Sequence, residues 1–217
     1  AAALTMGLAG VVGLRQDNLK RGLAFSTISQ LSYIVLGVAL LTPLAVFGAL
    51  LHVVAHAFMK ITLFFAAGVI YVETGEKYVS DLAGVGRRLP ATMTAFAIAA
   101  AGLIGFPLVA GFVSKFYLLL GAAASPNSVF VAAFLVAGVL KLLYFWPIVY
   151  GAFFGRRDGA TGASEHPFAP AHAASATDGG YAEDHAGAWE HRQPAREASP
   201  FLLGPVLFTA GMAVALG

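Results

Sequence analysis

The sequence contains no cysteine and few charged residues. Without cysteine, the chain has neither disulfides nor thiolate metal sites. Only 11% of its 217 residues are charged, whereas about 25% are charged in a typical soluble domain. Hydrophobic residues make up 59%, and the mean hydropathy is +0.78. These values exclude a soluble fold and predict an all-α integral membrane protein, a polytopic helical bundle in the lipid bilayer with no nucleic-acid partner.

Acidic residues are missing from the long apolar runs. All 11 Asp and Glu residues lie in polar loops or at the ends of these runs. Of the 13 Lys and Arg residues, three lie inside them: Lys60, Lys115 and Lys141. An ionisable side chain at bilayer depth costs roughly 3 kcal/mol on insertion scales, and such residues commonly line an ion path. The three lysines are therefore the first candidates for functional residues.

The apolar runs predict six membrane spans, since a crossing needs about 20 apolar residues. These spans are a run that ends at 14, the stretches 22–41, 44–71, 90–121 and 129–154, and a run that starts at 200. Residues 1–155 would form a transmembrane bundle, 156–199 a polar flexible cytoplasmic loop, and 200–217 the start of a further span. Both ends of the sequence lie within apolar runs, so we expect a piece of a longer polytopic protein, truncated at its N-terminus.

The other ten basic residues indicate the orientation of the spans. They all fall in the loops after the first, third and fifth spans, while the loops near 42–43 and 122–127 contain none. The positive-inside rule therefore predicts that the loops after the first, third and fifth spans are cytoplasmic. The long segment 156–199 is rich in Ala, Gly, Pro and charged residues, and we interpret it as a solvated linker or docking loop.

The run 90–121 contains signals for a broken helix. Proline removes a backbone donor and clashes with the preceding turn, and the flanking glycines lower the cost of unwinding. We predict a break near residues 102–111, marked by Gly105, Pro107 and Gly111, with Lys115 just past it. Broken helices beside a charge recur in ion transporters, where protein or a wet cavity covers the irregular backbone.

His52, His56 and Lys60 follow one another at intervals of four residues. On a helix each interval turns only about 40° past a full turn and rises about 6 Å, so the three side chains share one face. Histidine titrates near neutral pH, and the proton affinity of lysine depends on burial and nearby charge. The pattern predicts a proton relay, with simple helix packing as the alternative. A zinc site would lack a third ligand and a nearby Glu, so we expect no metal.

Two further sets of polar residues are open to two interpretations. Hydroxyl and amide groups in the span 22–41 either line a proton path or hold helices together; the candidates are Ser26, Ser29 and Gln30. Lys141 either belongs to the same polar axis or extends toward an interface beside Tyr144 and Trp146.

Several strings resemble the signatures of one membrane family. They are NLKRGLAFSTISQLSY from Asn18, the series His52, His56, Lys60 and Phe64, and AGFVSK from Ala110. Over roughly residues 1–155 the chain resembles the proton-conducting antiporter-like subunits of respiratory complex I, membrane-bound hydrogenases and Mrp-type cation/proton antiporters. The strings that begin at Gly86 and Tyr144 are most similar to the D-type component of Mrp antiporters.

The resemblance implies a protein of about 14 spans built from two inverted five-helix repeats, of which this sequence covers most of the second. It implies that Lys60 and the two histidines lie on a central polar axis and that Lys115 is the terminal lysine of that half-channel. The glutamate–lysine pair of the family's first repeat is absent here. The long loop 156–199 departs from the family's usual short connection.

On this resemblance we predict a proton-translocating subunit of a multisubunit Na⁺(cation)/H⁺ antiporter of Mrp type, in the cell (inner) membrane. Its partners would be other membrane subunits, protons and Na⁺, with no cofactor and no catalytic residue in this stretch. A charge change elsewhere in the complex would alter the proton affinity of Lys60, which passes a proton through His52, His56 and water to Lys115. The alternatives are a proton-pumping subunit of a complex I-like NADH-quinone oxidoreductase or hydrogenase, thus part of a redox-driven translocase, and a membrane scaffold.

Overall fold

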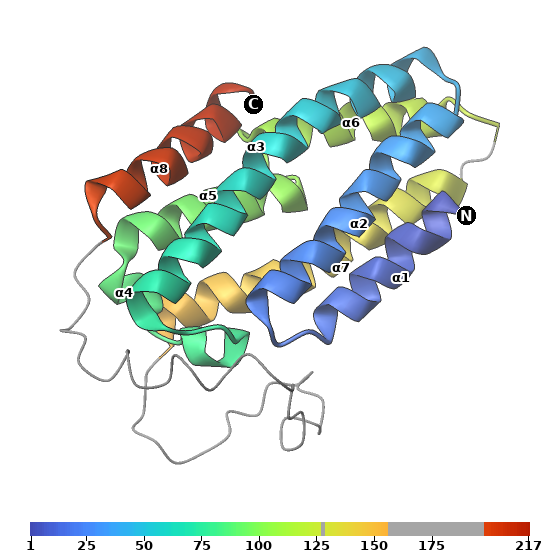
Figure 1. Cartoon of the computed structure of the whole chain (residues 1–217). Coiled ribbons are helices and arrows are strands. Elements are labelled where there is room, and N and C mark those ends of the chain that lie inside the picture. Colours follow the sequence, from blue (N-terminus) through green and yellow to red (C-terminus); the bar gives the residue numbers. More distant parts are fainter. Residues whose placement is uncertain (127–128, 156–197) are drawn as a thin grey trace, which may run out of the picture.

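The computed structural model describes residues 1–126, 129–155 and 198–217, and these residues form helices and short connections (Figure 1). The helices are α1 (Ala2–Leu14), α2 (Leu19–Ala39), α3 (Pro43–Thr74), η1 (Val79–Leu82), α4 (Val85–Arg88), α5 (Pro90–Ile104), α6 (Ala110–Ala123), α7 (Val129–Phe154) and α8 (Pro200–Ala215). By length and composition, α2, α3 and α7 are each able to cross a membrane. The predicted all-α membrane fold is therefore confirmed. The predicted loop 156–199 lies outside the described residues, apart from its last two positions.

Local signals set the ends of the long helices. The Asn18 side chain accepts a hydrogen bond from the Arg21 backbone N–H at 3.1 Å, which caps α2. The Thr42 side chain caps α3 in the same way, and Pro43 occupies the first turn, where no backbone donor is needed. Gly75, with φ of 78°, ends α3 in the left-handed conformation that glycine adopts without strain. As a result, α2 begins and α3 ends about one turn beyond the predicted spans.

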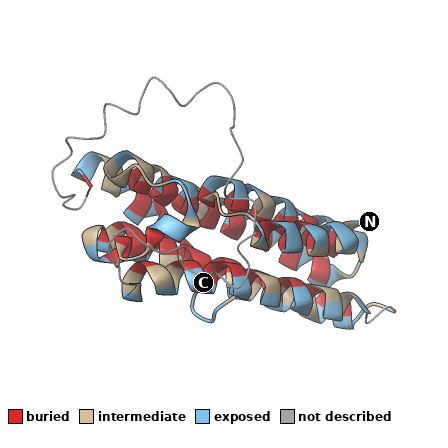
Figure 2. Cartoon of the chain, turned by 90° about the horizontal axis from the view of Figure 1, so that it is seen from below, coloured by how far each residue is buried: buried red, intermediate tan, exposed pale blue. Residues whose placement is uncertain are grey.

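The centre of the bundle is α3, which packs against α2, α5, α6 and α8 (Figure 1). Buried residues face the interior and exposed residues the periphery (Figure 2). The crossing of α3 and α6 is close because glycines lie on it. A Cβ at Gly48 would meet the Leu118 backbone nitrogen at 2.7 Å, and one at Gly121 would overlap the backbone of Ala45. Small residues of this kind let membrane helices approach closely.

The loops that follow α1 and α3 lie together at one end of the bundle. The Leu19 N–H donates to the Lys77 carbonyl at 3.0 Å, and the Val79 N–H donates to the Asp17 carbonyl at 2.7 Å. The end of α7 lies at this end too, since the Gly84 N–H donates to the Gly151 carbonyl at 3.2 Å. This arrangement agrees with the alternation of spans on which the orientation was predicted. The side of the membrane on which these loops lie stays a prediction.

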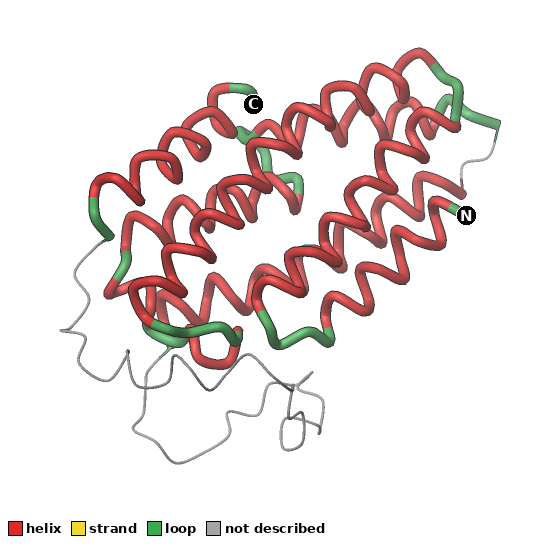
Figure 3. The backbone as a smooth tube through the Cα atoms, viewed as in Figure 1, coloured by secondary structure: helices red, strands yellow, loops and turns green. Residues whose placement is uncertain are grey.

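The predicted helix break is confirmed. The first arm, α5, ends at Ile104, and the second arm, α6, begins at Ala110; Figure 3 shows the irregular segment inside the bundle. Gly105 has φ of 98°, and the Phe106 N–H reaches back to the Ala101 carbonyl at 2.9 Å. The two arms touch at Gly111, where a Cβ would overlap the Gly102 carbonyl. The break therefore depends on glycine both for a left-handed turn and for close contact.

Candidate functional site

Three lysines from three helices lie in the interior of the bundle. Lys60 of α3 is 6% exposed, Lys115 of α6 is 8% exposed and Lys141 of α7 is 2% exposed. The helices that carry them pack together, with α6 against both α3 and α7. Like charges repel more strongly away from bulk water, so the charge on one lysine influences the charge on the next.

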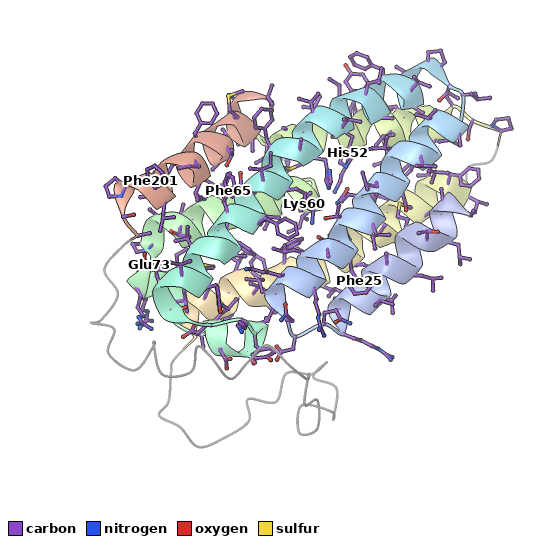
Figure 4. All side chains as sticks on the ribbon, viewed as in Figure 1. Phe25, His52, Lys60, Phe65, Glu73 and Phe201 are labelled. Atoms are coloured by element: carbon purple, nitrogen blue, oxygen red, sulfur yellow. The ribbon has the colours of Figure 1, made fainter. Side chains whose placement is uncertain are left out.

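Lys60 is held by polar groups of α2. Its ammonium donates to the Leu23 carbonyl at 2.8 Å and to the Ser26 hydroxyl. The Ser26 hydroxyl in turn donates to the Leu23 carbonyl at 2.9 Å. The ammonium also lies 5.9 Å from the centre of the Phe64 ring. Figure 4 shows Lys60 and His52 on the side of α3 that faces α2.

Lys115 is held by a backbone carbonyl that the helix break sets free. Its ammonium donates to the carbonyl of Leu103, in the last turn of α5. In a continuous helix that carbonyl would accept from the N–H of residue 107, but Pro107 has none. The side-chain N–H of Gln30 donates to the same carbonyl at 3.1 Å. The proline thus leaves an acceptor for the buried lysine, whose ammonium also lies 5.3 Å from the Tyr33 ring centre.

His52 connects α2 to α6, because both of its ring nitrogens are hydrogen-bonded. Its Nε2 is 2.8 Å from the Gln30 Oε1, and its Nδ1 is 2.8 Å from the Ser114 hydroxyl. Since the amide N–H of Gln30 points to the Leu103 carbonyl, its oxygen faces the histidine. His52 Nε2 therefore carries a hydrogen, and in the neutral ring Nδ1 accepts one from Ser114. Ser114 is the neighbour of Lys115 in α6.

His56 lies between His52 and the lysine cluster. The two imidazole rings stack with centroids 6.0 Å apart. The His56 Nε2 is buried and has no hydrogen-bond partner among the described residues. Lys60 follows His56 by four residues on the same face of α3. His52 is hydrogen-bonded at both ring nitrogens, whereas the Nε2 of His56 has no partner among the described residues.

The structure separates the remaining candidates. Ser26 and Gln30 face the lysines and His52, whereas the Ser29 hydroxyl donates to the Met6 carbonyl of α1 at 3.0 Å, a contact between helices. Lys141 lies inside the bundle, while Trp146 is 62% exposed on the outer face of the same helix. Gly105, Pro107 and Gly111 form the break. The roles of all these residues in transport stay predictions.

Three participants were not singled out from the sequence: Tyr33, Ser114 and the carbonyl of Leu103. The Tyr33 ring stacks on His52 with centroids 5.8 Å apart, and its position three residues after Gln30 places it on the same helix face. Ser114 is adjacent to Lys115. The sequence does contain a signal for the Leu103 carbonyl, because Pro107 lies four residues later and has no N–H to donate to it.

Comparisons with known proteins agree with this fold. Residues 1–141 match the family described as NADH:quinone oxidoreductase/Mrp antiporter, transmembrane. The chain is 41% identical over 170 residues to the N-type component of the NADH-quinone oxidoreductase of Desulforudis audaxviator, covering 78% of this chain and 34% of that protein. It is 34% identical over 156 residues to the D-type component of the Na⁺/H⁺ antiporter of Alkalihalophilus pseudofirmus, covering 72% and 32%.

The fold is also similar to a solved structure. A chain of the Mrp complex from Dietzia sp. superposes with a TM-score of 0.79 at 27% identity, covering 99% of this chain and 42% of that one. The chain spans about a third of the length of the curated relatives that it matches.

Proposed function

The chain belongs to the NADH:quinone oxidoreductase/Mrp antiporter transmembrane family, and on that premise we propose that it carries protons within a larger membrane subunit. The observation that supports this proposal is the presence of buried lysines and two buried histidines in the interior of one bundle. Lys60 shares α3 with His52 and His56, whose rings stack. His52 is hydrogen-bonded to Gln30 and to Ser114, the neighbour of Lys115 in α6. Charged groups at such depth are costly and are retained where ions move.

In the proposed transfer, Lys60 releases a proton that reaches His56 Nε2 through water. The proton continues to His52, whose Nδ1 takes it up when the Ser114 hydroxyl turns to the Gly111 carbonyl, and passes from there through water to a neutral Lys115. Each step moves one H⁺ from a protonated donor to a deprotonated acceptor, so a single positive charge moves along the axis. Lys141 of α7, the third buried lysine, would alter the energy of this transfer through its own charge.

Two reactions are candidates for driving proton transfer, and the arrangement of the lysines and histidines is compatible with both. The first is cation/proton exchange of the Mrp type with Na⁺ as the exchanged ion, supported by the similarity to the D-type component of an Na⁺/H⁺ antiporter and to the Mrp complex structure. The second is proton pumping driven by quinone reduction, supported by the 41% identity to the N-type component of an NADH-quinone oxidoreductase. Under either role the protein lies in the cell membrane beside other membrane subunits.

Inverted membrane vesicles that contain the full-length complex separate these candidates. The vesicles are energised, sodium is added, and the pH gradient is followed for the wild type and for Lys60→Ala. A sodium-dependent collapse that the variant lacks supports the antiporter. A gradient that forms only with NADH, without a response to sodium, supports the redox pump. If the assembled variant behaves like the wild type under both conditions, Lys60 is structural and the protein is a scaffold.

A further inference from the structure

Tyr144 of α7 carries a buried hydroxyl that the proposed transfer does not use. The side chain is 8% exposed, and its oxygen has no hydrogen-bond partner among the described residues. Its ring is fixed by an edge contact with Phe145, with centroids 4.9 Å apart. The other deeply buried tyrosine is different, because the Tyr33 hydroxyl donates to the Phe134 carbonyl at 2.9 Å. Buried phenols normally find a partner, so an unused one indicates a polar role.

The position of this hydroxyl is set by a glycine in the first turn of α2. A Cβ at Gly22 would overlap the Tyr144 oxygen, so only glycine lets the phenol reach the backbone of α2. The next residue is Leu23, whose carbonyl accepts from Lys60 at 2.8 Å. The hydroxyl therefore lies one residue along α2 from the anchor of the Lys60 ammonium.

A carboxylate lies in the loop just before the turn of α2 that the phenol touches. Asp17 precedes Asn18, whose carbonyl accepts from the N–H of Gly22 at 2.9 Å. This carboxylate is held in place, because it accepts from the Ser80 N–H at 3.1 Å and from the Ser80 hydroxyl at 3.0 Å. The Tyr144 hydroxyl thus meets α2 at Gly22, a position that lies in the chain between Asp17 and the Leu23 carbonyl that binds Lys60.

We propose that the Tyr144 hydroxyl passes protons between Lys60 and the end of the bundle that carries Asp17. The hydroxyl donates its hydrogen on one side while it accepts another on the opposite side, so the phenol has the same charge before and after each transfer. This inference rests on the proposed function and adds to it the route by which protons reach Lys60 from the surface of the bundle. Tyr144 is in this sense a proton-relaying residue, and Asp17 is the group that collects or releases the proton at the surface.

The test compares two substitutions on one helix in the full-length complex. Tyr144→Phe removes only the hydroxyl and keeps the buried ring, while Tyr150→Phe makes the same change at a position that is 57% exposed. We expect proton flux to fall roughly a hundredfold or more in Tyr144→Phe, as is typical when a proton-transfer group is lost, and to stay unchanged in Tyr150→Phe. Assembly, measured by size-exclusion chromatography, should be equal for both variants.

A double variant distinguishes a relay from a packing effect. If Asp17 and Tyr144 act in series, then Asp17→Asn should slow flux in the wild type but add nothing to Tyr144→Phe. Independent, multiplicative losses would overturn the relay. Wild-type flux in Tyr144→Phe, together with lost flux in Lys60→Ala, would overturn this inference and leave the proposed function intact. Wild-type flux in both variants would overturn both.

Discussion

The two terminal lysines obtain their hydrogen-bond acceptors in different ways. At Lys60 the acceptors belong to a regular helix, where the Leu23 carbonyl is shared with the hydroxyls of Ser26 and Thr27 at 2.9 and 3.0 Å. At Lys115 the acceptor is a carbonyl whose helical donor is missing because residue 107 is proline. A buried ammonium can thus be bound by a main-chain carbonyl and a hydroxyl of an intact helix, or by a carbonyl that a break in the helix leaves without a donor. The Lys115 acceptor depends on a larger part of the fold, because the break between α5 and α6 has to form first.

The largest expected effect is at the contact between the two arms of the break. Gly111→Ala would place a methyl group on the Gly102 carbonyl, and we expect the complex to lose about 3 kcal/mol of stability or more, together with its proton flux. The fraction of assembled complex that survives heating measures this loss. The matched control is Gly138→Ala in α7, where a Cβ meets no atom within 4 Å. Equal thermal stability of the two variants would refute the close contact.

A smaller effect is expected from restoring the missing donor. Pro107→Ala supplies an N–H that competes with Lys115 for the Leu103 carbonyl. We expect roughly fivefold slower proton flux, which corresponds to about 1 kcal/mol, the net value of one hydrogen bond. Pro205→Ala, at an exposed position inside α8, serves as the control and should leave flux unchanged. Unchanged flux in Pro107→Ala would mean that the freed carbonyl does not matter to transport.

The smallest expected effect lies at the Lys60 end. Ser26→Ala removes one of two acceptors and leaves the Leu23 carbonyl in place, so we expect flux to slow roughly threefold. Ser32→Ala is the matched control on the same helix, because that hydroxyl bonds the Ile28 carbonyl of its own helix. A loss in Ser26→Ala as large as that in Pro107→Ala would remove the difference between the two ends.

The same contrast explains what the sequence could predict. Hydropathy located the long helices, and the Gly and Pro residues located the break, because both signals are local. The His52, His56 and Lys60 face followed from helical periodicity alone. The hydrogen-bond partners of Ser29 and Gln30 could not be predicted in this way. Several polar residues lie on α2, and only the packing of α1 and α5 against it decides which partner each one has.

The hydrogen-bond acceptor of Lys115 could not be predicted from a sequence pattern alone. Its charge and its place after the break were visible in the sequence, but its acceptor is a main-chain atom of a leucine. Such an acceptor has no signature of its own. It becomes visible only when the donor removed by Pro107 is traced back four residues to Leu103. The contact of Tyr144 with Gly22 likewise depends on how α7 packs against the start of α2.

The central claim is that protons move along the axis from Lys60 to Lys115, and Lys115→Ala in the full-length complex tests it most directly. Proton flux would be measured in vesicles with a pH-sensitive dye, beside Lys20→Ala as a control that removes an exposed lysine in the first turn of α2. We predict that the Lys115→Ala complex assembles but conducts no protons, while Lys20→Ala conducts at the wild-type rate. Wild-type flux in an assembled Lys115→Ala complex would contradict the claim.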